Sequence, residues 1–221
     1  MREPFADRSA AGRELAEHLS HYAGRDDVVV LGLPRGGVPV AYEVARALDA
    51  PMDVFVVRKL GVPGHEELAM GAIASGGVRV LNEDVVAAIG IEERDIDAVA
   101  ARERTELERR ERTYRGDRHP IDVEGRTAIV VDDGLATGAT MRAAVKALRE
   151  RRAGTIVVAV PTASPETCAE LGEAVDEIIC ARTPEPFIAL GLWYDDFTPT
   201  SDDEVRRLVA EAAPAPAARR T

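Results

Sequence analysis

Apolar and polar residues follow one another in blocks that predict strands and helices in alternation along the chain. Short and almost wholly apolar runs, typical of strands that helices cover on both faces, lie between segments with apolar residues at helical spacing. The predicted strands are residues 27–32, 53–58, 127–132, 155–160 and 176–180. This alternation favours an α/β fold, a Rossmann-like parallel sheet with helices on both faces.

Two segments depart from the alternation. The stretches 68–74 and 78–81 flank a Ser-Gly-Gly sequence and predict a β-hairpin. Residues 92–115 are rich in Glu and Arg at helical spacing, and they contain few large apolar residues. These are Ile96, Val99, Leu107 and Tyr114. We favour a solvated helix stabilised by ion pairs between residues four apart, and a mobile lid is the alternative.

The pattern predicts one domain over residues 1–213. Its expected parts are a core at about 25–180, a charged helical insertion at about 82–120, and a C-terminal hood and helix at about 181–213. Residues 214–221, rich in Pro and Ala, are predicted to form a disordered tail.

Composition narrows the classes of partner. The chain has 221 residues and a net charge of −11, so nucleic acid and anionic membrane surfaces are not expected as partners. No apolar run approaches the ~20 residues that span a bilayer, and the first residues lack a secretory pattern. Cys168 and Cys180 lack CxxC spacing and are predicted to be buried thiols of a cytoplasmic protein.

Residues 128–140 carry the strongest functional signal. A buried strand ends in two adjacent carboxylates, Asp132 and Asp133, and a loop of small and hydroxylated residues leads into a helix. The loop residues are Ala136, Thr137, Gly138, Ala139 and Thr140. Free N–H groups and the positive end of the dipole at a helix start form a phosphate cradle. The two carboxylates suit ribose hydroxyls or a divalent cation. The alternative is a plain strand–turn–helix that the Asp pair caps.

This segment resembles the 5-phosphoribosyl-1-pyrophosphate (PRPP) signature of type I phosphoribosyltransferases. That signature has four apolar residues, two acidic ones and two more before a five-residue loop for the 5′-phosphate, here 128–131, 132–133, 134–135 and 136–140. The resemblance implies the fold of that family. It also implies Mg²⁺-dependent transfer of the phosphoribosyl group from PRPP to a nitrogen nucleophile, with release of pyrophosphate.

The resemblance assigns roles to the motif. Asp132 and Asp133 would hold the ribose hydroxyls and, directly or indirectly, the magnesium ion, and residues 136–140 would hold the 5′-phosphate. The acceptor, a nucleobase or related heterocycle, is not identified, and a homodimer is expected. The alternative function is a PRPP- or nucleotide-sensing regulator that has the same fold and no catalytic activity.

The loop after the first strand is a second candidate anion site, although an ordinary turn would look similar. Its two glycines allow backbone N–H groups to turn toward an anion, and an arginine adds a bidentate donor. The family holds pyrophosphate at this place, often through an unusual peptide geometry. This implies pyrophosphate binding by Arg35, Gly36 and Gly37.

Arg58 and Lys59 end the second predicted strand, where plain surface charge is the simplest interpretation. A similar Arg-Lys pair leads into the mobile catalytic loop of adenine phosphoribosyltransferases. The likeness implies that Arg58 and Lys59 neutralise the departing pyrophosphate. Glu67, in the glycine-containing segment that follows, is a candidate general acid or a solvated loop carboxylate.

Trp193 and Tyr194 lie where the family has the hood that covers the base. Either ring would stack on a heterocycle, and packing in the core is the alternative. Ala136 stands where hypoxanthine-guanine enzymes have an aspartate that assists at the purine ring. A 6-oxopurine acceptor used in that way is therefore a poor fit.

Overall fold

The main sheet of the computed structural model, which describes residues 3–212, has five parallel strands in the order β2-β1-β6-β7-β8. They are β1 Val28–Gly32, β2 Met52–Val54, β6 Thr127–Val131, β7 Thr155–Thr162 and β8 Glu177–Arg182. Every residue of β1 and β6 is buried. The continuous apolar runs therefore mark strands that are covered on both faces, as the pattern predicted.

Helices cover both faces of this sheet. They are α1 Arg8–His18, α2 Gly37–Leu48, α5 Ala139–Glu150, α6 Pro165–Gly172 and α7 Asp202–Glu211, with short 3₁₀ turns at Ser20–Tyr22 and Leu190–Trp193. Apolar residues of α1, α2 and α7 form one core cluster with one face of the strands, and those of α5 and α6 form a second cluster with the other face. The predicted α/β architecture is confirmed.

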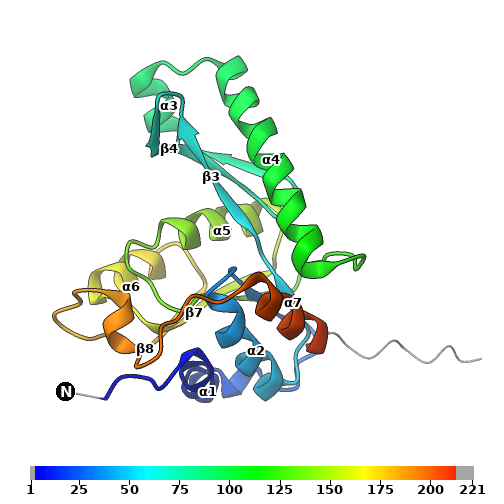
Figure 1. Cartoon of the computed structure of the whole chain (residues 1–221), viewed down its shortest axis with the longest axis vertical. Helices are drawn as coiled ribbons and strands as arrows, with labels where there is room; N and C mark the ends of the chain where they lie inside the picture. Colours follow the sequence, from blue (N-terminus) through cyan, green and yellow to red (C-terminus); the bar gives the residue numbers. More distant parts are fainter. Residues whose placement is uncertain (1–2, 213–221) are drawn as a thin grey trace, which may run out of the picture.

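A second, smaller sheet projects from the main one (Figure 1). Its antiparallel strands are β3 Val57–Val62, β4 His65–Ala74 and β5 Val78–Leu81, followed by α3 Glu83–Ile89 and α4 Glu93–Arg115. We call residues 57–115 the arm. The β4–β5 pair is the predicted hairpin. The segment after Lys59, where adenine phosphoribosyltransferases have a mobile loop, here forms the β3–β4 hairpin, with Gly64 in its turn at a φ of 80°.

The strand predicted at 53–58 is wrong in its extent. β2 ends at Val54 in the main sheet, and β3 begins at Val57 in the arm. The N–H of Phe55 still bonds to Gly32 in the main sheet, whereas that of Val56 bonds to the Ser75 hydroxyl in the arm. Phe55 and Val56 are both buried. The run of apolar residues therefore continues where the chain passes from β2 to β3, and the sequence pattern does not show the break between the two strands.

Helix α4 is the charged helix that the sequence predicted at residues 92–115. Its four predicted large apolar residues are buried, and its exposed side carries ion pairs such as Glu106 with Arg110. At its end, the buried Arg115 guanidinium bonds to both carboxylate oxygens of Asp53 at 3.0 Å. The last turn of α4 is thus fixed to β2.

The prediction of two buried thiols is wrong. Cys168 of α6 and Cys180 of β8 are half-buried and joined in a disulfide. α6 packs beside β8 through the intervening turn, and this packing brings together two residues that sequence spacing alone does not pair. Of the other sequence predictions, the tail at 214–221 lies outside the described residues. No helix within residues 3–212 is both long and apolar enough to cross a bilayer.

Candidate functional site

The loops after β1 and β6 meet at the carboxyl edge of the main sheet, because these two strands are neighbours. A Cβ atom added at Gly36 would lie 2.0 Å from Oδ2 of Asp133, and one added at Gly37 would lie 2.6 Å from the carbonyl oxygen of Val131. Any side chain would separate the two loops. The sequence thus needs both glycines to bring the proposed pyrophosphate loop against the acidic pair.

The predicted 5′-phosphate loop leads directly into α5. Gly138 is its N-cap at a φ of 67°, a conformation that glycine adopts without strain. Among the described residues, no side chain caps this helix, so the N–H groups of its first turn are open to an anion. Thr137 and Thr140 are exposed beside them, and the Thr167 hydroxyl fixes the loop by donating to the Ala136 carbonyl oxygen at 3.0 Å.

The acidic pair is tightly held. Oδ1 of Asp132 accepts from the N–H of Asp133 at 2.9 Å, and Oδ2 of Asp133 accepts from Nε of Arg8 at 2.8 Å. Burial, and then the charge of Asp133, raise the pKa of Asp132 well above its ordinary value of 3.8. Burial also raises the pKa of Asp133, although the Arg8 guanidinium opposes this. A cation or hydroxyl donors at Asp132 would therefore relieve an unfavourable charge.

Arg8 is a site residue that the sequence analysis missed. Its guanidinium lies over the ring of Phe197, 4.1 Å from the centroid, and donates to the carbonyl oxygen of Thr198 at 2.8 Å. Arg8 thereby links α1 and the C-terminal segment to Asp133. Because 125 residues separate the two partners, no local pattern indicates this contact.

The two predicted base-binding residues lie differently. Tyr194 is buried between the rings of Phe5 and Phe197, at centroid distances of 5.5 and 5.0 Å. Its hydroxyl donates to the carbonyl oxygen of Asp133 at 2.5 Å. Tyr194 thus supports the acidic pair from within the core. Trp193 is half-buried, and base binding by either residue stays a prediction.

The cations predicted to act in catalysis lie on opposite faces of the arm, because adjacent residues of a strand point in opposite directions. Nη2 of Arg58 donates to Glu103 of α4 at 2.7 Å. Lys59 is exposed on the other face and donates to the Glu67 carbonyl oxygen at 2.9 Å. Val57, on the same face of β3 as Lys59, packs against the apolar cluster that includes residues of α5, and β3 contacts α5, so we take the face of Lys59 to be the one turned toward α5. Catalysis by these two residues and by the exposed Glu67 stays a prediction.

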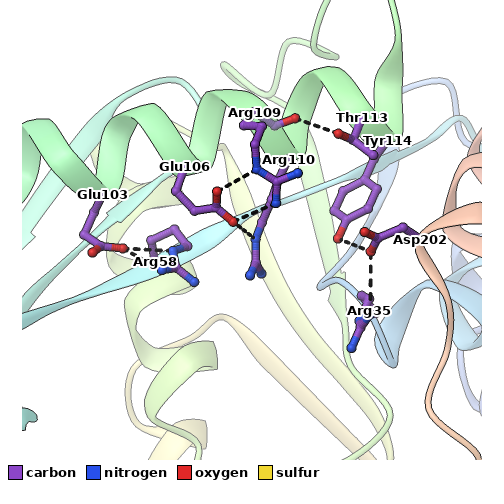
Figure 2. Close-up of polar contacts among 9 residues, drawn as sticks. All are labelled: Arg35, Arg58, Glu103, Glu106, Arg109, Arg110, Thr113, Tyr114 and Asp202. Carbon is purple, nitrogen blue, oxygen red and sulfur yellow. Dashed lines mark hydrogen bonds and ion pairs between the residues drawn. The ribbon is translucent and has the colours of Figure 1, made fainter.

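Arg35 follows a cis peptide bond between Pro34 and Arg35, an unusual geometry at the place where the resemblance implied one. Its Nη1 lies 3.7 Å from Oδ1 of Asp202 in the first turn of α7. The same oxygen accepts from the Tyr114 hydroxyl of α4 at 2.9 Å (Figure 2). The arm and α7 therefore both reach the proposed pyrophosphate loop.

Known proteins are similar to this chain in sequence and in fold. The family model described as the phosphoribosyl transferase domain matches residues 6–175. A Mycobacterium tuberculosis H37Rv protein, provisionally named a phosphoribosyl transferase, is 51% identical over 201 residues, which are 91% of this chain and 45% of that protein. The chain thus spans about half the length of this relative. The crystal structure of TT1426 from Thermus thermophilus is 41% identical and has a TM-score of 0.85, over 96% of this chain and all of that one. This chain belongs to the type I phosphoribosyltransferase family.

Proposed function

We propose that the protein transfers the 5-phosphoribosyl group of PRPP to a nitrogen nucleophile, a nucleobase or related heterocycle, and releases pyrophosphate. The observation that carries the proposal is the close approach of Gly36 and Gly37 to the acidic pair beside the open start of α5. The two glycines, the acidic pair and the start of α5 thus meet at one edge of the sheet, and we assign to them the pyrophosphate, the ribose and the 5′-phosphate of PRPP. These are the three parts of PRPP in their covalent order.

Each part of the substrate then has a physical partner. The amino terminus of α5 and the hydroxyls of Thr137 and Thr140 bind the 5′-phosphate. Asp132 accepts hydrogen bonds from the ribose hydroxyls, while Arg8 and Tyr194 hold its neighbour Asp133 in place. The backbone at Gly36 and Gly37 binds pyrophosphate. Lys59, on the arm face toward α5, meets the charge that grows as the C1–O bond breaks.

A magnesium ion fits this site only as one shared with the substrate. Within residues 3–212, no group of three or more His, Cys, Asp or Glu side chains could hold a metal ion. Magnesium commonly binds one or two carboxylates and completes its shell with water and phosphate oxygens. Asp132, whose raised pKa reflects an uncompensated charge, is the protein ligand of choice. Bound there, the ion would neutralise the leaving pyrophosphate.

The test is the release of pyrophosphate from PRPP and Mg²⁺ in the presence of a panel of purines, pyrimidines and related heterocycles, with product nucleotides identified by mass spectrometry. We expect one acceptor class to accelerate release, and Asp132→Asn to abolish it. Tight PRPP binding without turnover for any acceptor would contradict the proposal and favour the non-catalytic sensor. Assembly as a homodimer is a separate prediction, to be checked by light scattering.

A further inference from the structure

The pyrophosphate loop has polar partners that lie outside the family signature. Arg35 and Tyr114 share one oxygen of Asp202, so a residue of the loop, a residue of α4 and a residue of α7 converge on a single carboxylate (Figure 2). Burial, more than any other cause, raises the pKa of Tyr114, and its bond to Asp202 adds to this effect. The Tyr114 hydroxyl therefore keeps its proton at neutral pH and donates a hydrogen bond to Asp202.

Two more cations of α4 act electrostatically on the Tyr114–Asp202 pair. Arg110 is one helical turn before Tyr114 and on the same side of α4. The positive charges of Arg110 and Arg35 both act on the Tyr114 hydroxyl, where they oppose the rise of its pKa. The charge of Asp202 in turn helps to raise the pKa of Arg109. Three guanidinium groups are therefore close enough to affect the Tyr114–Asp202 pair.

Arg110 is available for a ligand. Its Nε donates to Glu106 at 2.8 Å, but Glu106 is also held by Arg109 at 2.7 and 2.9 Å. The side chain of Arg110 can move away without leaving the Glu106 carboxylate unpaired, because Arg109 remains as its partner. The side chain of Arg110 is 33% exposed, so it can turn. The Arg35–Asp202 contact is also half-exposed and 3.7 Å long. Pairs of this kind contribute little to stability, and an anion can replace the carboxylate at low cost.

We propose that Asp202 stands in for an anion in the unliganded protein, and that α4 supplies Arg110 to the pyrophosphate site. The pyrophosphate group displaces the Asp202 carboxylate and is bound by Arg35, Arg110 and the Tyr114 hydroxyl. This inference rests on the proposed function. The inference adds two groups to the proposed pyrophosphate site. Arg110 of α4 is a further cation, and the Asp202 carboxylate of α7 competes with pyrophosphate for the same partners.

The test is calorimetric titration of the full chain with inorganic pyrophosphate and Mg²⁺. Asp202→Asn removes the competing charge but keeps an oxygen that can accept from Tyr114, and it should tighten binding severalfold. Arg110→Ala should weaken binding about tenfold, the loss expected for one hydrogen bond to a charged group. Arg104→Ala, which removes an exposed arginine from the same helix, is the matched control and should leave binding unchanged.

Unchanged or weaker binding by Asp202→Asn would overturn the role of the stand-in carboxylate, and unchanged binding by Arg110→Ala would overturn that of the arginine. Arg110→Gln, which keeps most of the side chain, replaces the alanine variant if the latter does not melt cooperatively. Turnover of PRPP separates this inference from the proposed function. If all variants transfer the phosphoribosyl group normally and bind pyrophosphate with the same affinity, only this inference is contradicted. If the affinities change as expected but no acceptor is modified, only the proposed function is contradicted.

Discussion

At the scale of single residues, Asp132 and Asp133 differ sharply although they are adjacent. Asp133 is paired with Arg8 at 2.8 Å and is supported by Tyr194 through its carbonyl oxygen. Asp132 accepts a hydrogen bond from the backbone N–H of its neighbour, and its pKa is raised the more strongly of the two. The pair thus has one carboxylate that is paired with a cation of the protein and one that accepts from a backbone N–H, and we propose the second as the one that meets a ligand.

This difference predicts that removing the charge of each carboxylate changes stability by a different amount. A folded-state pKa above the ordinary 3.8 means that the folded protein binds the proton more tightly than the unfolded chain does. The contribution of Asp132 to the free energy of unfolding is therefore full in acid and is lost as the pH rises through the raised pKa. At pH 7, Asp132→Asn should raise that free energy by about 1 kcal/mol while it abolishes PRPP binding.

Asp133→Asn is the matched variant and should stabilise the protein less than Asp132→Asn does. The pKa of Asp133 is also raised by burial, so removal of its charge acts in the same direction, but the loss of the Arg8 guanidinium as its partner, at 11% side-chain exposure, opposes this gain. Urea denaturation of both variants at pH 5 and pH 7 compares the two changes in the free energy of unfolding. The stabilisation by Asp132→Asn should be smaller at pH 5. Equal effects of the two substitutions would contradict the division of roles.

At the scale of elements, the end of α4 sets where the arm stands. The side chains of Arg115 and Asp53 are each 6% exposed, and the guanidinium also donates to the Val54 carbonyl oxygen at 3.2 Å. Oδ2 of Asp53 accepts in addition from the N–H of Ile121 at 3.1 Å. Tyr114, which meets Asp202, is the residue next to Arg115. The buried pair therefore fixes the position from which α4 reaches Asp202 and, through it, the proposed pyrophosphate loop.

Breaking this pair should be costly. Arg115→Ala leaves Asp53 buried without its cation, and we expect the free energy of unfolding to fall by about 3–5 kcal/mol. Arg94→Ala, at an exposed ion pair of the same helix, should change it by less than about 0.5 kcal/mol. Urea denaturation followed by circular dichroism measures both values. Similar small losses in the two variants would show that the end of α4 is not anchored by charge.

At the scale of the whole molecule, the sequence predicted the layers and the loops at the carboxyl edge but not the partners of those loops. Buried strands and Gly-rich turns each have a signal in a short run of consecutive residues, so both were predicted from the sequence. Arg8 contacts Asp133 across 125 residues, and Tyr194 contacts it across 61. Contacts of this length depend on how the elements pack and leave no periodic signal. The break between β2 and β3 was missed for a related reason, since both sides of it are buried.

The disulfide makes a prediction at the same scale. It joins α6 to β8 across 12 residues of chain, so reduction should lower the free energy of unfolding by about 3 kcal/mol through the greater freedom of the unfolded chain. Thiol titration under denaturing conditions, before and after reduction, should show no free thiol and then two. Two free thiols in the protein as purified would contradict the pairing. The Cys168→Ala/Cys180→Ala variant, indifferent to reductant, is the control.

The support that Arg8 and Tyr194 give to Asp133 also bears on how the protein is made. During synthesis Arg8 leaves the ribosome first, the acidic pair follows more than a hundred residues later, and Tyr194 emerges another 61 residues on. A nascent chain that stops short of Tyr194 contains the entire PRPP signature but lacks the hydroxyl that supports it. If the proposed site binds PRPP, we expect that ability to arise late in translation, long after the residues that define the family have been joined.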